Sequence, residues 1–121
     1  MKAAKVLIVD DEQPNIEILQ RALARQGHAA AGAGSAESAA AALSAGRYDL
    51  VLLDHVLPGV TGMQSLPALG ALTKAPIYIM SGYTGDDTRQ DAMLLGAAGF
   101  LGKPMDLDEL FAVIAALPER A

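Results

Sequence analysis

The stretch KVLIVDD, residues 5–11, places an unbroken apolar run directly before two acidic residues. A strand with one solvent-exposed face alternates apolar and polar residues, whereas a strand that is buried on both faces can be apolar throughout. The run therefore predicts a strand in the interior of a parallel sheet. YDLVLLD, residues 48–54, repeats the arrangement, because its apolar residues also end on an acid, Asp54.

The rest of the chain alternates short apolar segments with longer amphipathic ones. Segments 29–34, 75–82 and 98–104 predict three further strands, and 29–34 is the weakest because it contains only alanine and glycine. Helices are predicted between the strands and after the last one, at residues 14–27, 35–46, 62–73, 84–96 and 106–117. Pro67 and Gly70 weaken the third of these helices. Five βα units of this kind predict an α/β fold, with a parallel sheet and helices on both faces.

Composition limits the kind of protein this can be. With 121 residues the chain has the length of a single domain, over residues 1–121. It contains no cysteine, which excludes disulfides and thiolate zinc sites, and no apolar run approaches the roughly 20 residues of a membrane span. The net charge is −5 and the basic residues are scattered, which argues against direct nucleic-acid binding. A soluble, cytoplasmic domain without a membrane partner is predicted.

Polar residues follow four of the predicted strands. They are Asp10, Asp11 and Glu12 after the first strand, Asp54 after the third, Ser81 and Gly82 after the fourth, and Lys103 and Pro104 after the fifth. Each alone has an ordinary explanation as a cap or turn residue, so only the joint pattern favours a site. In open α/β sheets ligands bind beyond the carboxyl ends of the strands, and clustered carboxylates need a cation to stay ionised. Mg²⁺ suits such oxygen ligands, and Asp54 could then accept a phosphoryl group.

Four stretches stand in an order and spacing that resemble the receiver domain of two-component response regulators. They are VDDE (9–12), LLDHVLPGVTG (52–62), IMSGY (79–83) and FLGKP (100–104), and they span nearly the whole chain. The resemblance implies a flavodoxin-like (βα)5 doubly wound fold, with strand order 2-1-3-4-5. It also implies a phosphorylation-activated signalling switch rather than an enzyme that turns over a substrate.

The resemblance implies a phosphoacceptor and a metal site. Asp54 would accept the phosphoryl group from a sensor histidine kinase or a histidine phosphotransfer protein. Mg²⁺, or Mn²⁺ in its place, would be held by Asp10, Asp11, Asp54 and the backbone carbonyl of Val56. No further cofactor is expected.

The resemblance also implies how the switch works. Lys103 would pair with the acyl phosphate, and Ser81 would move in to hydrogen-bond a phosphoryl oxygen. Phe100 would then turn inward as the switch aromatic residue. An output protein or domain would bind the surface of residues 85–117, and the Lys103–Pro104 peptide bond would be cis.

Three alternative functions fit these residues less well. A Mg²⁺-dependent phosphatase with an aspartyl nucleophile needs a second acid where Val56 stands, and usually a cap domain as well. A flavodoxin-type cofactor binder needs a Ser/Thr/Gly-rich loop in place of the acidic DDEQPN (10–15). A degenerate receiver would lack site residues that are present here. His55 could be a metal ligand or a phosphohistidine, but strand alternation points it away from the side of Asp54, which favours a packing or surface role.

Overall fold

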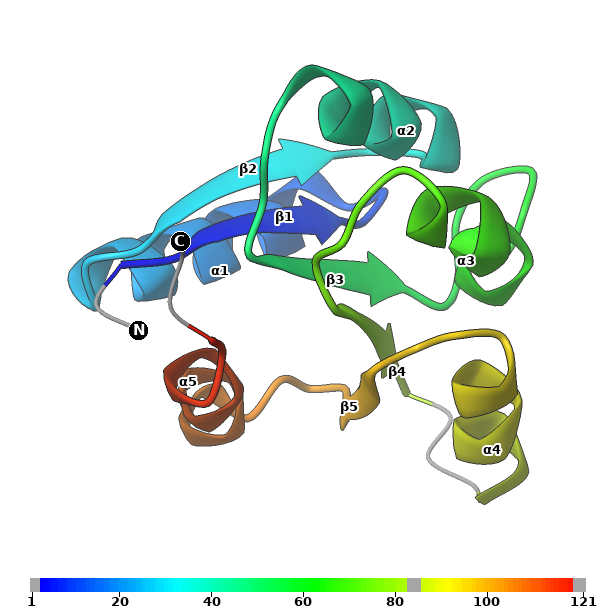
Figure 1. The fold of residues 1–121 in the computed structure, drawn as a ribbon. Coiled ribbons are helices and arrows are strands. Elements are labelled where there is room, and N and C mark those ends of the chain that lie inside the picture. The colour runs from blue at the N-terminus through cyan, green and yellow to red at the C-terminus, as the bar shows by residue number, and fades with distance from the viewer. Residues whose placement is uncertain (1–2, 83–85, 119–121) are drawn as a thin grey trace.

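The computed structural model describes residues 3–82 and 86–118. Within these ranges five strands alternate with five helices (Figure 1). The elements are β1 (Lys5–Val9), α1 (Gln13–Arg25), β2 (Ala29–Ala33), α2 (Ala36–Ala45), β3 (Leu50–Asp54), α3 (Gly62–Gly70), β4 (Ile77–Ser81), α4 (Asp86–Leu94), β5 (Gly99–Gly102) and α5 (Leu107–Ala115). The predicted alternation is confirmed, and the weak segment 29–34 does form a strand.

The five strands form one parallel sheet in the order β2-β1-β3-β4-β5. Val9 pairs with Leu53 across β1 and β3, and Asp54 pairs with Met80 across β3 and β4. Because all strands run in the same direction, their carboxyl ends meet at one edge of the sheet. The predicted flavodoxin-like strand order is therefore confirmed, and it brings the acidic strand ends together.

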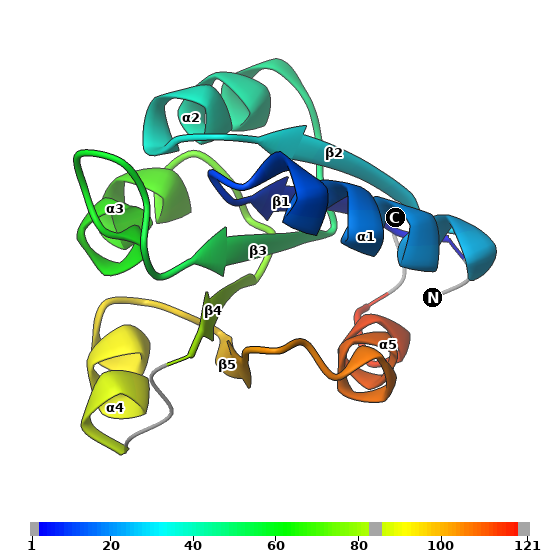
Figure 2. The same cartoon turned by 180° about the vertical axis from the view of Figure 1, so that it is seen from behind.

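Alternating side chains divide the core into two layers. Val51 and Leu53 of β3 face a cluster that includes buried residues of α2, α3 and α4. Leu50 and Leu52 face the opposite cluster, which includes buried residues of α1 and α5. Figures 1 and 2 show the two sets of helices flanking the sheet. This burial on both faces explains why β1 and β3 have no polar alternation.

Local signals fix most of the helix starts. Ser35 Oγ accepts a hydrogen bond from the backbone N–H of Ser38, and Asp106 caps α5 by accepting from two backbone N–H groups. Thr61 and Gln64 form a reciprocal capping box at the start of α3. The helix α3 forms despite Pro67, because Met63, Leu66 and Leu69 are buried in the core. No helix in the part of the chain that the structure describes is both long and apolar enough to cross a membrane.

Gly62 joins the end of β3 to the start of α3 at very close range. Its backbone N–H donates to the carbonyl oxygen of His55 at 2.8 Å. A Cβ atom at this position would overlap with the backbone carbonyl oxygen of Asp54. The absence of a side chain at Gly62 therefore lets the loop that follows Asp54 fold back against the strand.

Replacement of Gly62 tests this close approach. We expect Gly62→Ala to lower the free energy of unfolding by about 1–3 kcal/mol, because the backbone at Asp54 has to shift to admit the methyl group. The matched control is Gly70→Ala in the same helix, where a Cβ meets no atom within 4 Å. Urea unfolding should show Gly70→Ala to be as stable as the wild type or slightly more so. Equal stability of the two variants would contradict the packing described here.

Candidate functional site

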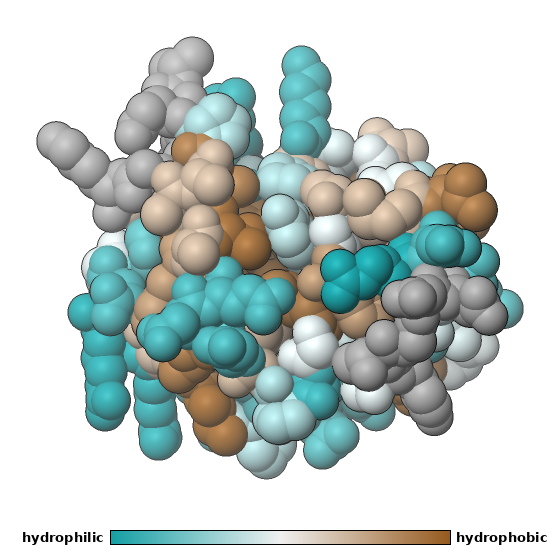
Figure 3. All heavy atoms as spheres, turned by 90° about the horizontal axis from the view of Figure 1, so that it is seen from below, coloured by the Kyte–Doolittle hydropathy of each residue, from teal (hydrophilic) through white to brown (hydrophobic). Residues whose placement is uncertain are grey.

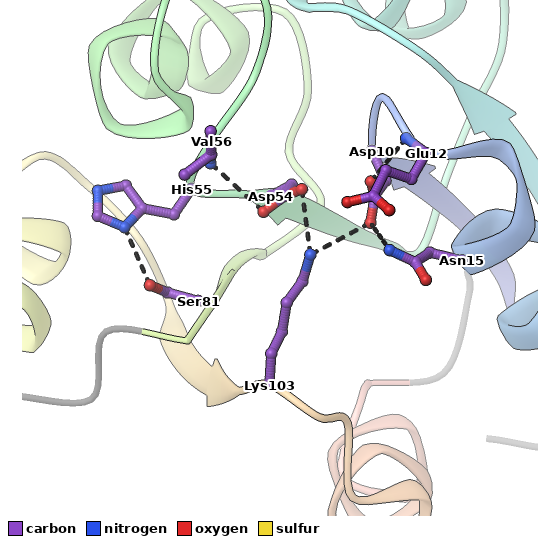
Figure 4. A network of polar contacts seen from close by, with 8 residues as sticks. All are labelled: Asp10, Glu12, Asn15, Asp54, His55, Val56, Ser81 and Lys103. Atoms are coloured by element: carbon purple, nitrogen blue, oxygen red, sulfur yellow. Dashed lines mark hydrogen bonds and ion pairs between the residues drawn. The ribbon is translucent and has the colours of Figure 1, made fainter.

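Lys103 joins two acidic strand ends at the carboxyl edge of the sheet. Its Nζ atom lies 3.1 Å from Oδ2 of Asp54 and 3.3 Å from Oδ2 of Asp10 (Figure 4). Asp54 ends β3, Asp10 follows β1, and Lys103 follows β5. The structure thus brings together three of the residues that the sequence placed in one site. The Lys103–Pro104 peptide bond is cis, as expected.

Burial makes the charges at this site interdependent. Asp10 and Asp54 are only 1% and 5% exposed. Burial has the largest effect on the pKa of Asp54 and raises it above its ordinary value. The charge of Asp10 raises this pKa further, whereas Lys103 lowers it. Burial alone would lower the pKa of Lys103, but the hydrogen bonds and charges of the two carboxylates outweigh it and raise this pKa. Lys103 therefore stays protonated between the two acids.

The loop after β1 holds a cluster of three acids. Carboxylate oxygen atoms of Asp10, Asp11 and Glu12 lie within 4.8 Å of one another. Asp10 is fixed by a hydrogen bond of 2.9 Å from the backbone N–H of Glu12, and by one of 3.4 Å from the side-chain amide of Asn15. Asp11 and Glu12 are exposed, so their oxygen atoms are open to an incoming ligand. A set of hard oxygen donors on a short loop fits Mg²⁺ or Mn²⁺.

A pocket of about 260 Å³ opens beside Asp54. It is lined by Asp11, Glu12, Asp54, His55, Val56, Ser81, Gly82 and Lys103. The backbone N–H of Val56 donates to Oδ1 of Asp54 at 3.3 Å, and the side chain of Val56 is 57% exposed at the rim. The pocket therefore contains a carboxylate, an ammonium group and a hydroxyl. The role of the Val56 carbonyl as a metal ligand stays a prediction.

The side chain of His55, the residue after β3, points in a different direction from that of Asp54, as strand alternation predicted, although both residues line the pocket (Figure 4). Its ring forms a 2.9 Å hydrogen bond between Nδ1 and Oγ of Ser81, which the sequence analysis missed (Figure 4). The contact follows from the register of the sheet, because the backbone N–H of His55 donates to the carbonyl of Met80, the residue before Ser81. Only knowledge of this register, together with the side-chain direction, could have revealed it.

Phe100 is already inside the protein. Its side chain is only 7% exposed and packs in the cluster beneath α2, α3 and α4. The guanidinium carbon of Arg89 lies 5.5 Å from the centre of the Phe100 ring, which places a cation over its outer face. The ring is thus buried while Ser81 is bonded to His55.

Removal of the buried charge of Asp54 tests the electrostatics. In metal-free protein at pH 7 we expect Asp54→Asn to increase the free energy of unfolding, since the folded state raises the pKa of this group and so disfavours its charged form. The pKa of Asp54 is higher in the folded protein than in the unfolded chain. Ionisation of Asp54 therefore lowers the free energy of unfolding as the pH rises through and above 3.8. The gain from Asp54→Asn should therefore shrink as the pH falls toward 3.8. Urea unfolding in a chelator at several pH values measures this, and a less stable Asp54→Asn at pH 7 would contradict it.

Comparison with known proteins agrees with this site. Residues 6–115 match the family model of the response regulator receiver domain. The transcriptional regulatory protein TcrA of Mycobacterium tuberculosis (strain ATCC 25618 / H37Rv) is 33% identical over 121 residues. These cover 99% of this chain but 48% of TcrA, so the chain spans about half the length of that curated relative.

Two solved structures extend the comparison. A two-component response regulator from Clostridium difficile has a TM-score of 0.88 at 28% identity, with 93% of each chain covered. A response regulator protein from Burkholderia pseudomallei, solved with a phosphorylated aspartic acid, calcium ion and citrate, has a TM-score of 0.83 at 27% identity. This match covers 94% of the present chain and 66% of the other. Because the family model matches most of this chain, the chain belongs to the response regulator receiver domains.

Proposed function

We propose that this receiver domain is a cytoplasmic switch that is activated when Asp54 accepts a phosphoryl group. The ion pair of 3.1 Å between Asp54 and Lys103, at the mouth of a polar pocket, is the observation that carries the proposal. The family is consistent with phosphorylation-dependent signalling. Val56 stands where a phosphatase with an aspartyl nucleophile needs a second acid, so we expect the domain to catalyse only its own phosphorylation and dephosphorylation.

The proposed reaction uses residues that already lie together. One carboxylate oxygen of Asp54 forms a bond to phosphorus, while the bond between phosphorus and the donor's histidine nitrogen breaks. Lys103 neutralises the carboxylate before the transfer and the acyl phosphate after it. Because its pKa is raised, Lys103 keeps its positive charge throughout.

Receiver domains generally bind Mg²⁺ at an acidic pocket, and we assign this role to the acids around Asp54. Asp10, Asp11, Asp54 and the Val56 carbonyl would hold Mg²⁺, or Mn²⁺ in its place. When bound, the metal supplies positive charge for the phosphoryl oxygen atoms. The Burkholderia pseudomallei relative was solved with both a phosphorylated aspartic acid and a calcium ion, which agrees with the assignment of a divalent cation to a phosphorylated receiver.

A second, apolar pocket supports a protein as the phosphoryl donor. It has about 290 Å³ and lies against the acidic site, with Asp10 and Lys103 among its lining residues. Ile18 of α1 and Leu107 of α5 also line it, and Ile18 is 60% exposed. An apolar rim beside the acids suits a helix of a sensor histidine kinase or a histidine phosphotransfer protein, both of which must bring a histidine to Asp54.

The output surface is proposed over residues 85–117, which include Leu107 of the donor pocket, and of which residue 85 lies outside the described residues. Figure 3 views the molecule from below Figure 1 and shows apolar side chains between hydrophilic ones. On α4 and just after it, Met93, Leu94 and Leu95 are 48%, 84% and 41% exposed. Such residues suit a protein partner, and the net charge of −5 argues against direct contact with nucleic acid.

Phosphorylation by a small-molecule donor tests the proposed function. We expect intact-mass measurement to show one added phosphoryl group after incubation with acetyl phosphate and Mg²⁺, and none in Asp54→Asn. The exposed Asp108→Asn is the matched control and should be labelled like the wild type. A chelator should abolish the labelling. Equal labelling of wild type and Asp54→Asn would refute Asp54 as the acceptor.

A further inference from the structure

The hydrogen bond between His55 and Ser81 occupies the hydroxyl group that the proposed function requires elsewhere. Ser81 is 2% exposed, and its Oγ lies 2.9 Å from Nδ1 of His55. In Figure 4 the Ser81 hydroxyl points toward His55 and away from the carboxylate of Asp54. Both residues nevertheless line the same pocket as Asp54. The hydroxyl is therefore near the acceptor but turned toward a different partner.

The backbone holds His55 in place for this contact. Its N–H donates to the carbonyl of Met80 in β4 at 2.9 Å, and its carbonyl accepts from the N–H of Gly62 in α3 at 2.8 Å. The residue is thus anchored to the strand that ends on Ser81 and to the helix that follows the loop. These backbone bonds fix the point from which the His55 side chain starts, beside the end of β4.

We propose that His55 is a positioning residue that holds the Ser81 hydroxyl away from Asp54 until a phosphoryl group displaces the contact. This inference rests on the proposed function, since it requires a phosphoryl group on Asp54. His55 would then oppose the phosphorylated state, because its bond to Ser81 must break before Ser81 can reach the phosphoryl group.

The competition follows from the chemistry of the two groups. A serine hydroxyl has a single hydrogen, so it cannot donate to the ring and to a phosphoryl oxygen at once. If Nδ1 accepts, that hydrogen is already used; if Nδ1 donates, the ring still holds the oxygen in place. A charged phosphoryl oxygen is the stronger acceptor and wins the exchange, but the lost bond to His55 reduces the net gain.

The structure also provides space for the ring once it is released. A pocket of about 480 Å³ between α3 and α4 is lined by His55, Met63, Thr88, Asp91, Leu94 and Leu95. This pocket gives the freed ring a direction in which to turn. Because this pocket borders α4, the position of the ring changes the surface next to the proposed output face.

Affinity for beryllofluoride, a phosphoryl analogue, tests the inference in the presence of Mg²⁺. His55→Phe keeps a ring but loses Nδ1, and we expect it to bind beryllofluoride about fivefold more tightly than the wild type, the value of one ordinary net hydrogen bond. His55→Asn places an amide near the position of Nδ1 and should bind like the wild type. In a Ser81→Ala background, His55→Phe should have no effect, because the contact is already absent.

Several results would overturn the inference. Unchanged or weaker binding by His55→Phe would show that the ring does not oppose the phosphorylated state. The same gain in the Ser81→Ala background would show that His55 acts by another route. These results leave acetyl phosphate labelling of Asp54 intact, so the proposed function would stand. A wild-type protein that bound no beryllofluoride and took no label would contradict the proposed function and this inference with it.

Discussion

The ammonium group of Lys103 lies between the carboxylates of Asp10 and Asp54, and the carboxyl edge of the sheet depends on this arrangement. Two nearly buried carboxylates side by side would be strongly unfavourable without a cation. Lys103 supplies one positive charge, while Asp11 and Glu12 add two more acids to the same edge. The site therefore keeps an excess of negative charge, which is the electrostatic condition for taking up a divalent cation.

Strand order explains how a residue of β5 reaches the end of β3. The strand β4 lies between them, and it ends on Ser81, whose side chain is short. The backbone N–H of Lys103 donates to the carbonyl of Ser81 at 2.9 Å. This bond places the Cα atom of Lys103 next to the end of β4. From there the long side chain extends past Ser81 to Asp54 (Figure 4).

Much of the fold and of the site could be predicted from sequence, because the signals are local. Continuous apolar runs marked β1 and β3 as interior strands, and the acids that end them had to meet at one edge of a parallel sheet. β2 and α3 were harder to predict. Pairing with β1 overrides the poor strand propensity of Ala29–Ala33, and burial of one face of α3 overrides the poor helix propensity of Pro67. The contact between His55 and Ser81 could not be predicted, because it depends on strand register and rotamer. The burial of Phe100 beneath Arg89 depends likewise on tertiary packing.

Equilibrium unfolding at increasing Mg²⁺ concentration measures directly whether this acidic edge holds a cation beside Lys103. We expect the free energy of unfolding of the wild type to rise with Mg²⁺ once the Mg²⁺ concentration exceeds the dissociation constant. In Asp11→Asn, which removes one exposed acid of the cluster, the same rise should need a higher concentration. A wild type whose stability does not respond to Mg²⁺, or an Asp11→Asn that responds identically, would refute a cation site in this acidic cluster.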